Sequence, residues 1–274
     1  MKKIIIIAIL WIAIFQANGQ SAKEYKNKGN IKFDLEDYKG AIGDYTKAIQ
    51  LNPKYAEAYY NRGFAKYYLK DFRGVIIDLN KAILLNSKDS TFYTLRGLAK
   101  YELEDYRGSI LDYTKAILLS PKFAQVYHGR GLAKNALKDY TSAILDFTAA
   151  IELNSKDSDS YYERGIAKYK LEDYRGSILD FNIVILRDST NTDAYIERGR
   201  SKSGIKDFKA AILDFDTAIR LDAKNSSAYF LRAGAKIELN DKEGACLDWS
   251  KAGELGQLGA YGMIKIFCTD FLNK

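Results

Sequence analysis

Apolar and small residues follow helical spacing along the chain in successive blocks separated by short polar breaks. Between residues 56 and 89, the first block holds Tyr59, Gly63, Phe64, Tyr67 and Leu69, and the second holds Phe72, Val75, Ile76, Leu79, Ala82 and Ile83. Intervals of three and four residues predict amphipathic α-helices. An aspartate stands in the break, where its carboxylate can accept hydrogen bonds from the free N–H groups that open the second helix. The pattern therefore predicts two antiparallel helices joined by a turn.

This two-helix pattern recurs every thirty-four residues without an insertion. Seven copies begin at Ala22, Ala56, Ser90, Ala124, Ser158, Thr192 and Ser226. The aspartate of the break keeps its place in all of them, at Asp37, Asp71, Asp105, Asp139, Asp173, Asp207 and Asp241. Self-similarity at this period is typical of a stacked array in which each repeat covers the apolar face of its neighbour. We therefore expect an all-α array over residues 22–259.

Small residues recur at two places where the helices of such an array must come close. Glycine occupies the eighth position of six repeats, as Gly29, Gly63, Gly97, Gly131, Gly165 and Gly199, and alanine recurs late in the second helix. A glycine inside a helix costs about 1 kcal/mol relative to alanine, so its repeated use predicts close backbone packing. Both prolines, Pro53 and Pro121, stand at a repeat boundary, where a helix has to stop.

Taken together, these positions resemble the tetratricopeptide repeat. The match consists of the small eighth, twentieth and twenty-seventh residues, the proline at position thirty-two, and a tyrosine at position four in Tyr59, Tyr93, Tyr127 and Tyr161. The resemblance implies a right-handed superhelical solenoid of seven helix-turn-helix repeats whose first helices line a concave groove. It also implies a scaffold or adaptor that binds a protein or peptide, although such repeats serve many partners.

Two positions depart from the family pattern, and both carry charge. The seventh, often leucine in the family, is arginine in six repeats, and the eleventh, often aromatic, is lysine in all seven. An aspartate column accompanies them in the second helix, at Asp44, Asp78, Asp112, Asp146, Asp180, Asp214 and Asp248. These columns predict repeated inter-helix ion pairs; the alternative is a charged strip that contacts a ligand. We favour ion pairs because identical residues in every repeat serve stacking better than selective recognition.

In the family, positions two, five, nine, twelve and thirteen of the first helix tend to face the groove. The resemblance therefore implies a partner-binding groove that contains Tyr60, Phe64, Tyr67, Tyr68, Leu98, Tyr101, His128, Leu132, Tyr162, Ile166 and Tyr169. Tyrosines can stack on apolar side chains and hydrogen-bond to a peptide backbone, which favours a protein or peptide ligand. The structural alternative is packing against adjacent repeats, most strongly at position twelve. There are two functional alternatives. One is a self-associating structural element of the cell envelope, which would be a homo-oligomer, and the other is a module that binds glycans.

Some family members grip a partner's C-terminal carboxylate with a clamp of lysine, asparagine and arginine side chains. The matching positions here are Lys26, Asn30 and Asn61, followed by Thr91 and Leu95. The two missing residues are cations, which supply the strongest hydrogen bonds to a carboxylate. We therefore do not expect a working clamp.

Residues 1–19 have the pattern of a secretory signal peptide. Lys2 and Lys3 precede an unbroken apolar run over residues 4–15, and residues 17–19 have the small-x-small form that signal peptidase accepts. That run is too short to span a bilayer, which takes roughly 20 residues. We expect cleavage after Gly19, export to the periplasm or exterior of a bacterium, and no membrane-spanning segment in the mature chain. The alternatives are an uncleaved anchor and a buried helix.

Composition and charge offer no sign of catalysis. The formal net charge is +7, but acidic and basic residues are interleaved, whereas a nucleic-acid binder usually clusters its cations. His128 is the only histidine, so one chain cannot build a histidine-based metal site or a Ser-His-Asp arrangement. The phosphate-binding form GxxxxGK does not occur. We expect no enzyme, no catalytic or metal-ligating residue, no cofactor and no nucleic-acid partner.

The two cysteines belong to the end of the array. Cys246 stands where the other six repeats have isoleucine, so its side chain should point inward. Residues 260–274 are predicted to form a helix that caps the seventh repeat. One face of that helix holds Tyr261, Ile264, Cys268 and Phe271. Both thiols then reach the same interface, where an oxidising compartment would favour a disulfide; two free buried thiols are the alternative.

Overall fold

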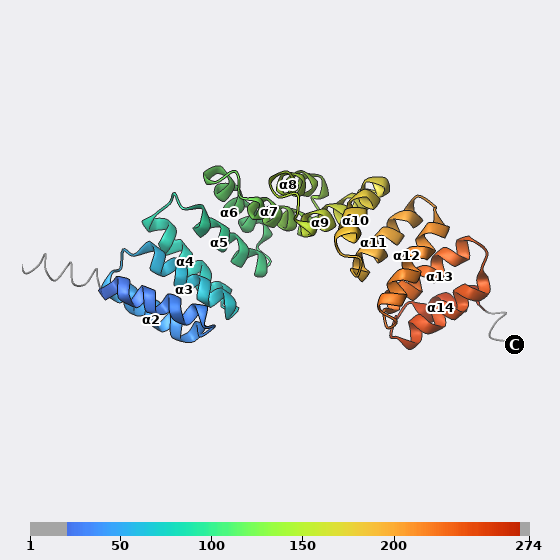
Figure 1. Ribbon diagram of the computed structural model, residues 1–274, viewed down its shortest axis with the longest axis horizontal. Coiled ribbons are helices and arrows are strands. Elements are labelled where there is room, and N and C mark those ends of the chain that lie inside the picture. Colours follow the sequence, from blue (N-terminus) through green and yellow to red (C-terminus); the bar gives the residue numbers. More distant parts are fainter. Residues whose placement is uncertain (1–20, 269–274) are drawn as a thin grey trace, which may run out of the picture. The chain divides into compact units, whose positions relative to one another are not determined.

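The computed structural model describes residues 21–268, which form α-helices joined by short turns, and no strand occurs among them (Figure 1). The first helices of the repeats are residues 21–34, α3 (Ala56–Tyr68), α5 (Ser90–Glu102), α7 (Ala124–Ala136), α9 (Ser158–Lys170), α11 (Thr192–Gly204) and α13 (Ser226–Glu238). The second helices are α2 (Tyr38–Leu51), α4 (Phe72–Leu85), α6 (Tyr106–Leu119), α8 (Tyr140–Leu153), α10 (Tyr174–Arg187), α12 (Phe208–Leu221) and α14 (Lys242–Glu254). The last helix is α15 (Ala260–Phe267). The prediction of an all-α repeat solenoid is confirmed; the predicted signal peptide lies outside the described residues.

The aspartate of the break caps each second helix. In the first repeat, the carboxylate of Asp37 accepts a hydrogen bond from the backbone N–H of Gly40 at 2.9 Å. The same bond recurs at the start of all the other second helices. Each such cap stabilises its helix by about 1 kcal/mol. This geometry explains why aspartate occupies that position in every repeat.

The turn before this cap has the same backbone form in every repeat. The N–H of Asp37 bonds to the carbonyl of Lys32, and the N–H of Glu36 bonds to the carbonyl of Phe33, both at 2.9 Å. This pair of bonds is the Schellman motif, which places one residue in the left-handed region. That residue is Glu36, Lys70, Glu104, Lys138, Glu172, Lys206 or Asn240, with φ between 59° and 64°. None of the seven is glycine, so the sequence carries no glycine signal for this turn.

The charged columns form a ladder of ion pairs between helices. In the third repeat, Asp112 is 4% exposed and accepts hydrogen bonds from Nε and Nη2 of Arg96 at 2.9 and 2.5 Å. Lys100 Nζ lies 2.8 Å from the same carboxylate. Arg96 Nη1 also donates to Asn80 of the preceding repeat at 2.7 Å, and the guanidinium lies over the Tyr93 ring. The second, fifth, sixth and seventh repeats hold the equivalent pairs, so the prediction of structural ion pairs is confirmed.

Close approach between the two helices of a repeat explains the glycine at position eight. A Cβ atom added to Gly199 would lie 2.6 Å from the buried ring of Phe215, and one added to Gly29 would lie 2.5 Å from the ring of Tyr45. Distances below 3.0 Å require the neighbour to move, and a packed ring has little room to do so. Glycine therefore lets the large side chain of the second helix reach the core.

The repeats divide between two compact units, of which the N-terminal unit ends at Leu137 and the C-terminal unit begins at Lys138. In the N-terminal unit, α3 packs on α5 and α5 on α7, while α4 and α6 each pack on the first helices of their own and the next repeat. The C-terminal unit repeats this arrangement with α9, α11 and α13 and their second helices. In each unit the first helices therefore form one layer and the second helices form another. None of the described helices is long and apolar enough to cross a membrane.

A cap closes the C-terminal unit. Helix α15 packs on α14, and a disulfide joins Cys246 to Cys268. Trp249 belongs to the same buried hydrophobic cluster as the two cysteines, and it stacks on Phe267 with ring centroids 5.5 Å apart. Tyr261 was expected to be buried on this face of the helix; its ring lies against Gly253 of α14, but the side chain remains 58% exposed, so the expected burial is wrong. Phe267 contributes the aromatic ring that packs on Trp249, and the predicted contribution of Phe271 lies outside the described residues.

Candidate functional site

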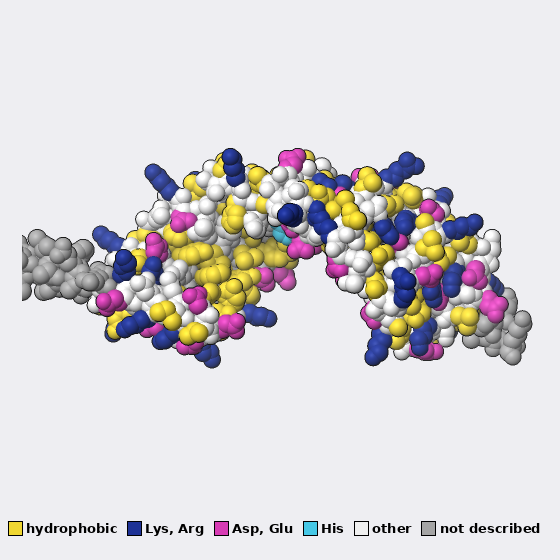
Figure 2. Space-filling view, viewed as in Figure 1, with side chains coloured by type: hydrophobic (Ala, Val, Ile, Leu, Met, Phe, Trp, Pro, Cys, Tyr) yellow, Lys and Arg dark blue, Asp and Glu magenta, His cyan; other side chains and the backbone are white. Residues whose placement is uncertain are grey.

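The N-terminal unit carries an aromatic cluster on its first helices and at the start of α2. Phe64 stacks on Phe33 with ring centroids 5.2 Å apart and on Tyr60 at 6.1 Å. Tyr68 meets Phe33 edge-on at 5.4 Å and stacks on Tyr38 at 4.8 Å. Tyr68 is half exposed and the other four rings are partly exposed. Figure 2 shows apolar side chains gathered on a hollowed part of this unit's surface. The cluster thus offers contiguous rings to a ligand.

A small polar pocket adjoins these rings. Its volume is about 280 Å3, and its lining is Asn30, Phe33, Asp34, Tyr45, Asn61 and Phe64. Asn30 Oδ1 accepts hydrogen bonds from Tyr45 Oη at 2.9 Å and from Asn61 Nδ2 at 3.0 Å. Burial, with smaller contributions from Asp34 and Asp44, raises the pKa of Tyr45 to about 12. The Tyr45 hydroxyl is a donor to Asn30, and the raised pKa extends the pH range over which it keeps its proton.

The carboxylate clamp is incomplete in space as well as in sequence. Asn30 and Asn61 come together, and Lys26 pairs with Glu57 at 3.3 Å. Leu95, at one position where a clamp needs a cation, is 5% exposed and belongs to the core. Thr91, at the other, donates its hydroxyl hydrogen bond to Asp89. The asparagine pair can still hydrogen-bond to a ligand, but it has no adjacent arginine or lysine from the third repeat.

The tyrosines at position twelve pack mainly within their own repeats. Each lies against the first residue of the second helix, with centroid distances of 5.3–5.5 Å in the pairs Tyr67–Phe72, Tyr101–Tyr106 and Tyr169–Tyr174. The structural alternative for this position was packing against adjacent repeats, and only part of the observed packing involves an adjacent repeat. The Tyr67 hydroxyl reaches Glu102 at 3.4 Å. These tyrosine rings therefore stabilise the first-helix layer more than they provide contact surface for a ligand.

The remaining predicted groove residues differ in their surroundings. Leu98, His128 and Leu132 are half-buried in the N-terminal unit. In the C-terminal unit, Tyr162 meets the buried ring of Phe181 edge-on at 5.5 Å, and Ile166 packs on the same core. The structure thus brings Tyr60, Phe64 and Tyr68 together into one site.

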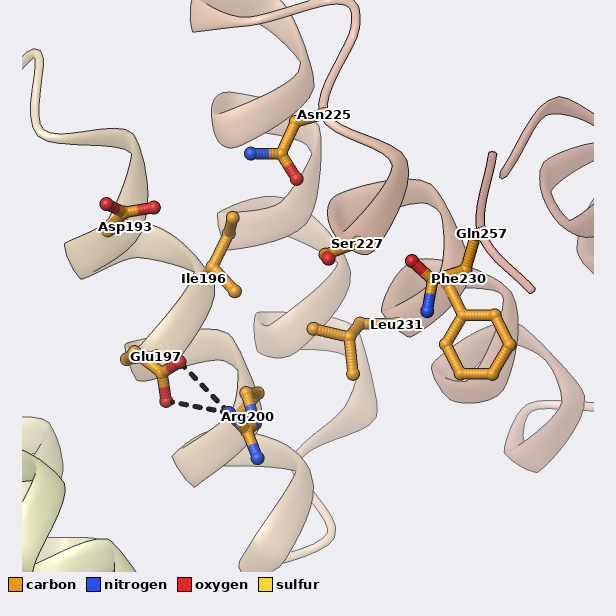
Figure 3. A pocket seen from close by; sticks show the side chains of 9 residues that line it. All are labelled: Asp193, Ile196, Glu197, Arg200, Asn225, Ser227, Phe230, Leu231 and Gln257. Atoms are coloured by element: carbon orange, nitrogen blue, oxygen red, sulfur yellow. Dashed lines mark hydrogen bonds and ion pairs between the residues drawn. The ribbon is translucent and has the colours of Figure 1, made fainter. Parts of the chain in front are cut away.

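The C-terminal unit has a charged pocket on its first-helix layer (Figure 3). Its volume is about 310 Å3, and its lining is Asp193, Ile196, Glu197, Arg200, Asn225, Ser227, Phe230, Leu231 and Gln257. Arg200 Nη1 donates to both carboxylate oxygens of Glu197 at 3.0 and 3.2 Å. The Arg200 guanidinium also lies 4.8 Å from the centroid of the Tyr169 ring. The arginine is thereby fixed between a carboxylate and an aromatic face.

Electrostatic interactions extend from this pocket to a predicted groove residue. Burial raises the pKa of Tyr162, and the carboxylates of Glu197 and Asp193 raise it further. Burial alone would lower the pKa of Arg200, but the interactions with Glu197 and Tyr169 together outweigh that effect and the pKa is raised. Both shifts favour the forms that tyrosine and arginine already have at neutral pH, so a neutral Tyr162 lies near the charged Arg200 that Glu197 holds in place.

Neither Phe33 nor the charged pocket was predicted from the sequence. The same positional pattern could have found the pocket, since Asp193 and Arg200 occupy positions two and nine of the sixth repeat and Phe230 occupies position five of the seventh. Phe33 stands at position twelve of the first repeat. Its role depends on Phe64 of the next repeat, which only the packing of the two helices shows.

Helical hairpins in tandem, with glycine, alanine and tyrosine at fixed positions, define a helical-repeat protein. A family profile for the TPR repeat matches residues 29–70, and two profiles for the tetratricopeptide repeat match residues 94–158 and 192–225. The chain belongs to the tetratricopeptide-repeat family. No curated protein sequence matches it significantly.

Solved structures of other repeat proteins share this fold. A tetratricopeptide repeat protein from Parabacteroides merdae is 22% identical, with a TM-score of 0.65 over 92% of this chain and 100% of its own. The C-terminal part of a TPR repeat-containing protein from Cytophaga hutchinsonii is 19% identical, with a TM-score of 0.72 over 85% and 95%. YrrB, described as a TPR protein with an unusual peptide-binding site, is 21% identical, with a TM-score of 0.62 over 67% and 95%.

Proposed function

We propose that this protein is an exported, non-enzymatic scaffold that holds a peptide or an extended segment of a partner protein against its first helices. The observation that carries the proposal is the aromatic cluster of Tyr60, Phe64 and Tyr68 around Phe33. Its rings pack on one another and still leave apolar surface open, as at Tyr68, which is half exposed. Rigid aromatic side chains lose little conformational entropy on binding, so they are efficient anchor points for a ligand.

Polar groups beside the rings favour a peptide over a purely apolar ligand. The Asn30–Asn61 pair can hydrogen-bond to a backbone amide, and the adjoining pocket of about 280 Å3 has room for a side chain. The charged pocket around Arg200 offers a second place for polar contacts, in the C-terminal unit. A peptide presents apolar side chains and amide groups in alternation, which matches such a surface.

Two observations support export. The first is the signal-like pattern of residues 1–19, with its cationic start and small residues at the cleavage point. The second is the bond between Cys246 and Cys268, because structural disulfides persist in oxidising compartments such as the periplasm and the cell exterior. We place the mature protein in one of these two compartments of a bacterium.

Selection from a displayed peptide library tests the proposed function. Peptides that bind the wild type would be synthesised with a fluorophore and titrated by fluorescence anisotropy. Replacement of Tyr60 and Tyr68 by alanine should raise Kd at least tenfold, since each removes an aromatic contact area of the kind that dominates binding. Tyr261→Ala is the control, because it removes from α15 a tyrosine that is 58% exposed, close to the 50% of Tyr68.

Equal Kd values for the wild type and the Tyr60/Tyr68 variant would show that the aromatic cluster is not the binding surface. Light scattering of the purified protein distinguishes self-association from a monomer that binds a partner. A dimer or larger oligomer that dissociates in the same variant would mean that the surface is filled by a second copy.

A further inference from the structure

The second helices of the N-terminal unit expose aliphatic side chains on the side away from the first helices. Positions 18, 22, 26 and 29 of the repeat are spaced by three and four residues, so they share one side of the helix. On α4 and α6, positions 22 and 29 are aliphatic, and these residues are 67–76% exposed: Ile77, Leu84, Leu111 and Leu118. Single exposed leucines are ordinary, but a repeated set on consecutive helices indicates an interaction surface.

Cations accompany these aliphatic residues. Positions 18 and 26 of α2, α4 and α6 are all basic and all exposed, as Lys39, Lys47, Arg73, Lys81, Arg107 and Lys115. No acidic residue occupies positions 18, 22, 26 or 29 of these three helices. The aspartates of the same helices are in the ladder, where Asp78 and Asp112 are buried and paired. We call these aliphatic and basic residues of α2, α4 and α6 the outer face.

We propose that the outer face binds the surface of an anionic lipid bilayer. Aliphatic side chains such as Leu111 and Leu118 would enter the boundary between headgroups and acyl chains. The long stems of Arg107 and Lys115 would follow them while their charged ends stay among the phosphates. Basic residues near an anionic membrane add attraction that salt weakens within a Debye length.

Charge complementarity favours lipid over the other occupants of such a surface. A second copy of the chain docked face to face would place six cations against six cations. A protein partner would have to be acidic opposite every one of these helices. Lipid phosphates supply negative charge at uniform density, together with the apolar layer that the four aliphatic side chains require. In the C-terminal unit, α10 and α12 also expose leucines and lack acidic residues at these positions, but α8 carries Glu152 there and α14 carries Glu243 and Glu254. Three consecutive second helices with basic residues at both positions 18 and 26 occur in the N-terminal unit, so we assign the surface to that unit.

Vesicle co-sedimentation tests this inference with proteins that begin at Gln20. They keep every helix that the structure describes and omit the apolar run of residues 4–15, which could bind lipid by itself. The wild type should bind vesicles of phosphatidylglycerol and phosphatidylcholine in equal parts at least a hundredfold more tightly than vesicles of phosphatidylcholine alone. The Leu111→Ser, Leu118→Ser double variant should lose about tenfold in affinity. Replacement of the four cations on α4 and α6 by glutamine should lose about a hundredfold.

Two control variants replace residues of the same types at exposed positions outside the outer face. Leu35→Ser with Leu258→Ser removes two leucines that are 75% and 96% exposed in turns. A second control replaces four exposed lysines of the C-terminal unit by glutamine, at Lys156, Lys170, Lys206 and Lys224. Both should bind the anionic vesicles within about threefold of the wild type, as should the Tyr60/Tyr68 variant, because the outer face is independent of the aromatic cluster. Circular dichroism would show that every variant is folded.

Failure of the wild type to bind the anionic vesicles would overturn the inference. So would equal binding to neutral vesicles, or equal losses in the outer-face variants and their controls. Without vesicles, light scattering should show the same mass for the wild type and the Leu111/Leu118 variant. A dimer that this variant abolishes would assign the outer face to a second copy, against the lipid assignment.

Discussion

Removal of a single ladder aspartate should destabilise the protein strongly. Asp112 is 4% exposed and receives charged donors from Arg96 and Lys100. Asp112→Ala leaves both cations without this partner, in side chains that are only 18% and 20% exposed. Breaking a buried ion pair from one side costs about 3–5 kcal/mol. The lower end applies here, because both cations keep some access to water and Arg96 keeps its hydrogen bond to Asn80.

A loss of about 3 kcal/mol corresponds to a fall in Tm of roughly 6–12 °C for a chain of this size. Circular dichroism at 222 nm during heating measures it directly. Glu254→Ala is the control, because the Lys251–Glu254 pair is 47% and 60% exposed and should contribute less than about 0.5 kcal/mol. The difference between the two variants should persist at 0.5 M salt, since buried pairs are screened little. Equal Tm values for Asp112→Ala and Glu254→Ala would refute the reasoning that the ladder is a buried, interdependent network.

Three further predictions concern packing, pH and the disulfide. Gly199→Ala should lower the free energy of unfolding in urea by about 1–3 kcal/mol, because the new methyl group would lie 2.6 Å from a buried ring; Gly43→Ala, which meets open space, should raise it by about 0.5–1 kcal/mol. Burial raises the pKa of Tyr45 to about 12, so its contribution is complete below pH 10 and is lost as pH rises from 10 to 12. Tyr45→Phe should therefore make that decline in urea-measured stability shallower, and identical slopes would contradict the assignment. Reduction of the Cys246–Cys268 bond should lower stability by about 3 kcal/mol, and an unchanged melt with reductant would show that the bond contributes nothing.

The fold was predictable from the sequence because its determinants are local and repeated. The caps at Asp37 and its equivalents, the glycine at position eight and the Arg–Lys–Asp columns each appear several times at one spacing. Each also has one physical explanation that fits every copy. The same repetition allowed the ion-pair ladder to be distinguished from a ligand-binding strip, since Asp112 and its equivalents have the same role in the second, third, fifth and sixth repeats.

The candidate site was predictable only in part, because it depends on what differs between repeats. Tyr60 and Tyr68 could be assigned to the first-helix layer by position, but the stack of Phe33 on Phe64 depends on the packing of two neighbouring helices. Tyr67 was assigned to the groove by the same positional rule, whereas its ring packs on Phe72. A position on a helix fixes the direction of a side chain, and its neighbours decide whether the ring remains available.

The left-handed conformation of the turns could not be predicted from the sequence, for a different reason. Glu36 and Lys70 adopt φ near 60°, a region that favours glycine. The Schellman bonds and the aspartate cap hold the turn in place despite the cost. A residue type alone therefore gives no indication of this conformation.

Site-specific photocrosslinking in cells that produce the protein tests the central claim most directly. A photoreactive phenylalanine would replace Tyr68 in the aromatic cluster, or the similarly exposed Tyr261 on α15 as the reference. Irradiation should join the protein to a partner polypeptide from position 68 and give no protein adduct from position 261. Adducts from position 261 without any from position 68 would contradict a partner held against the first helices.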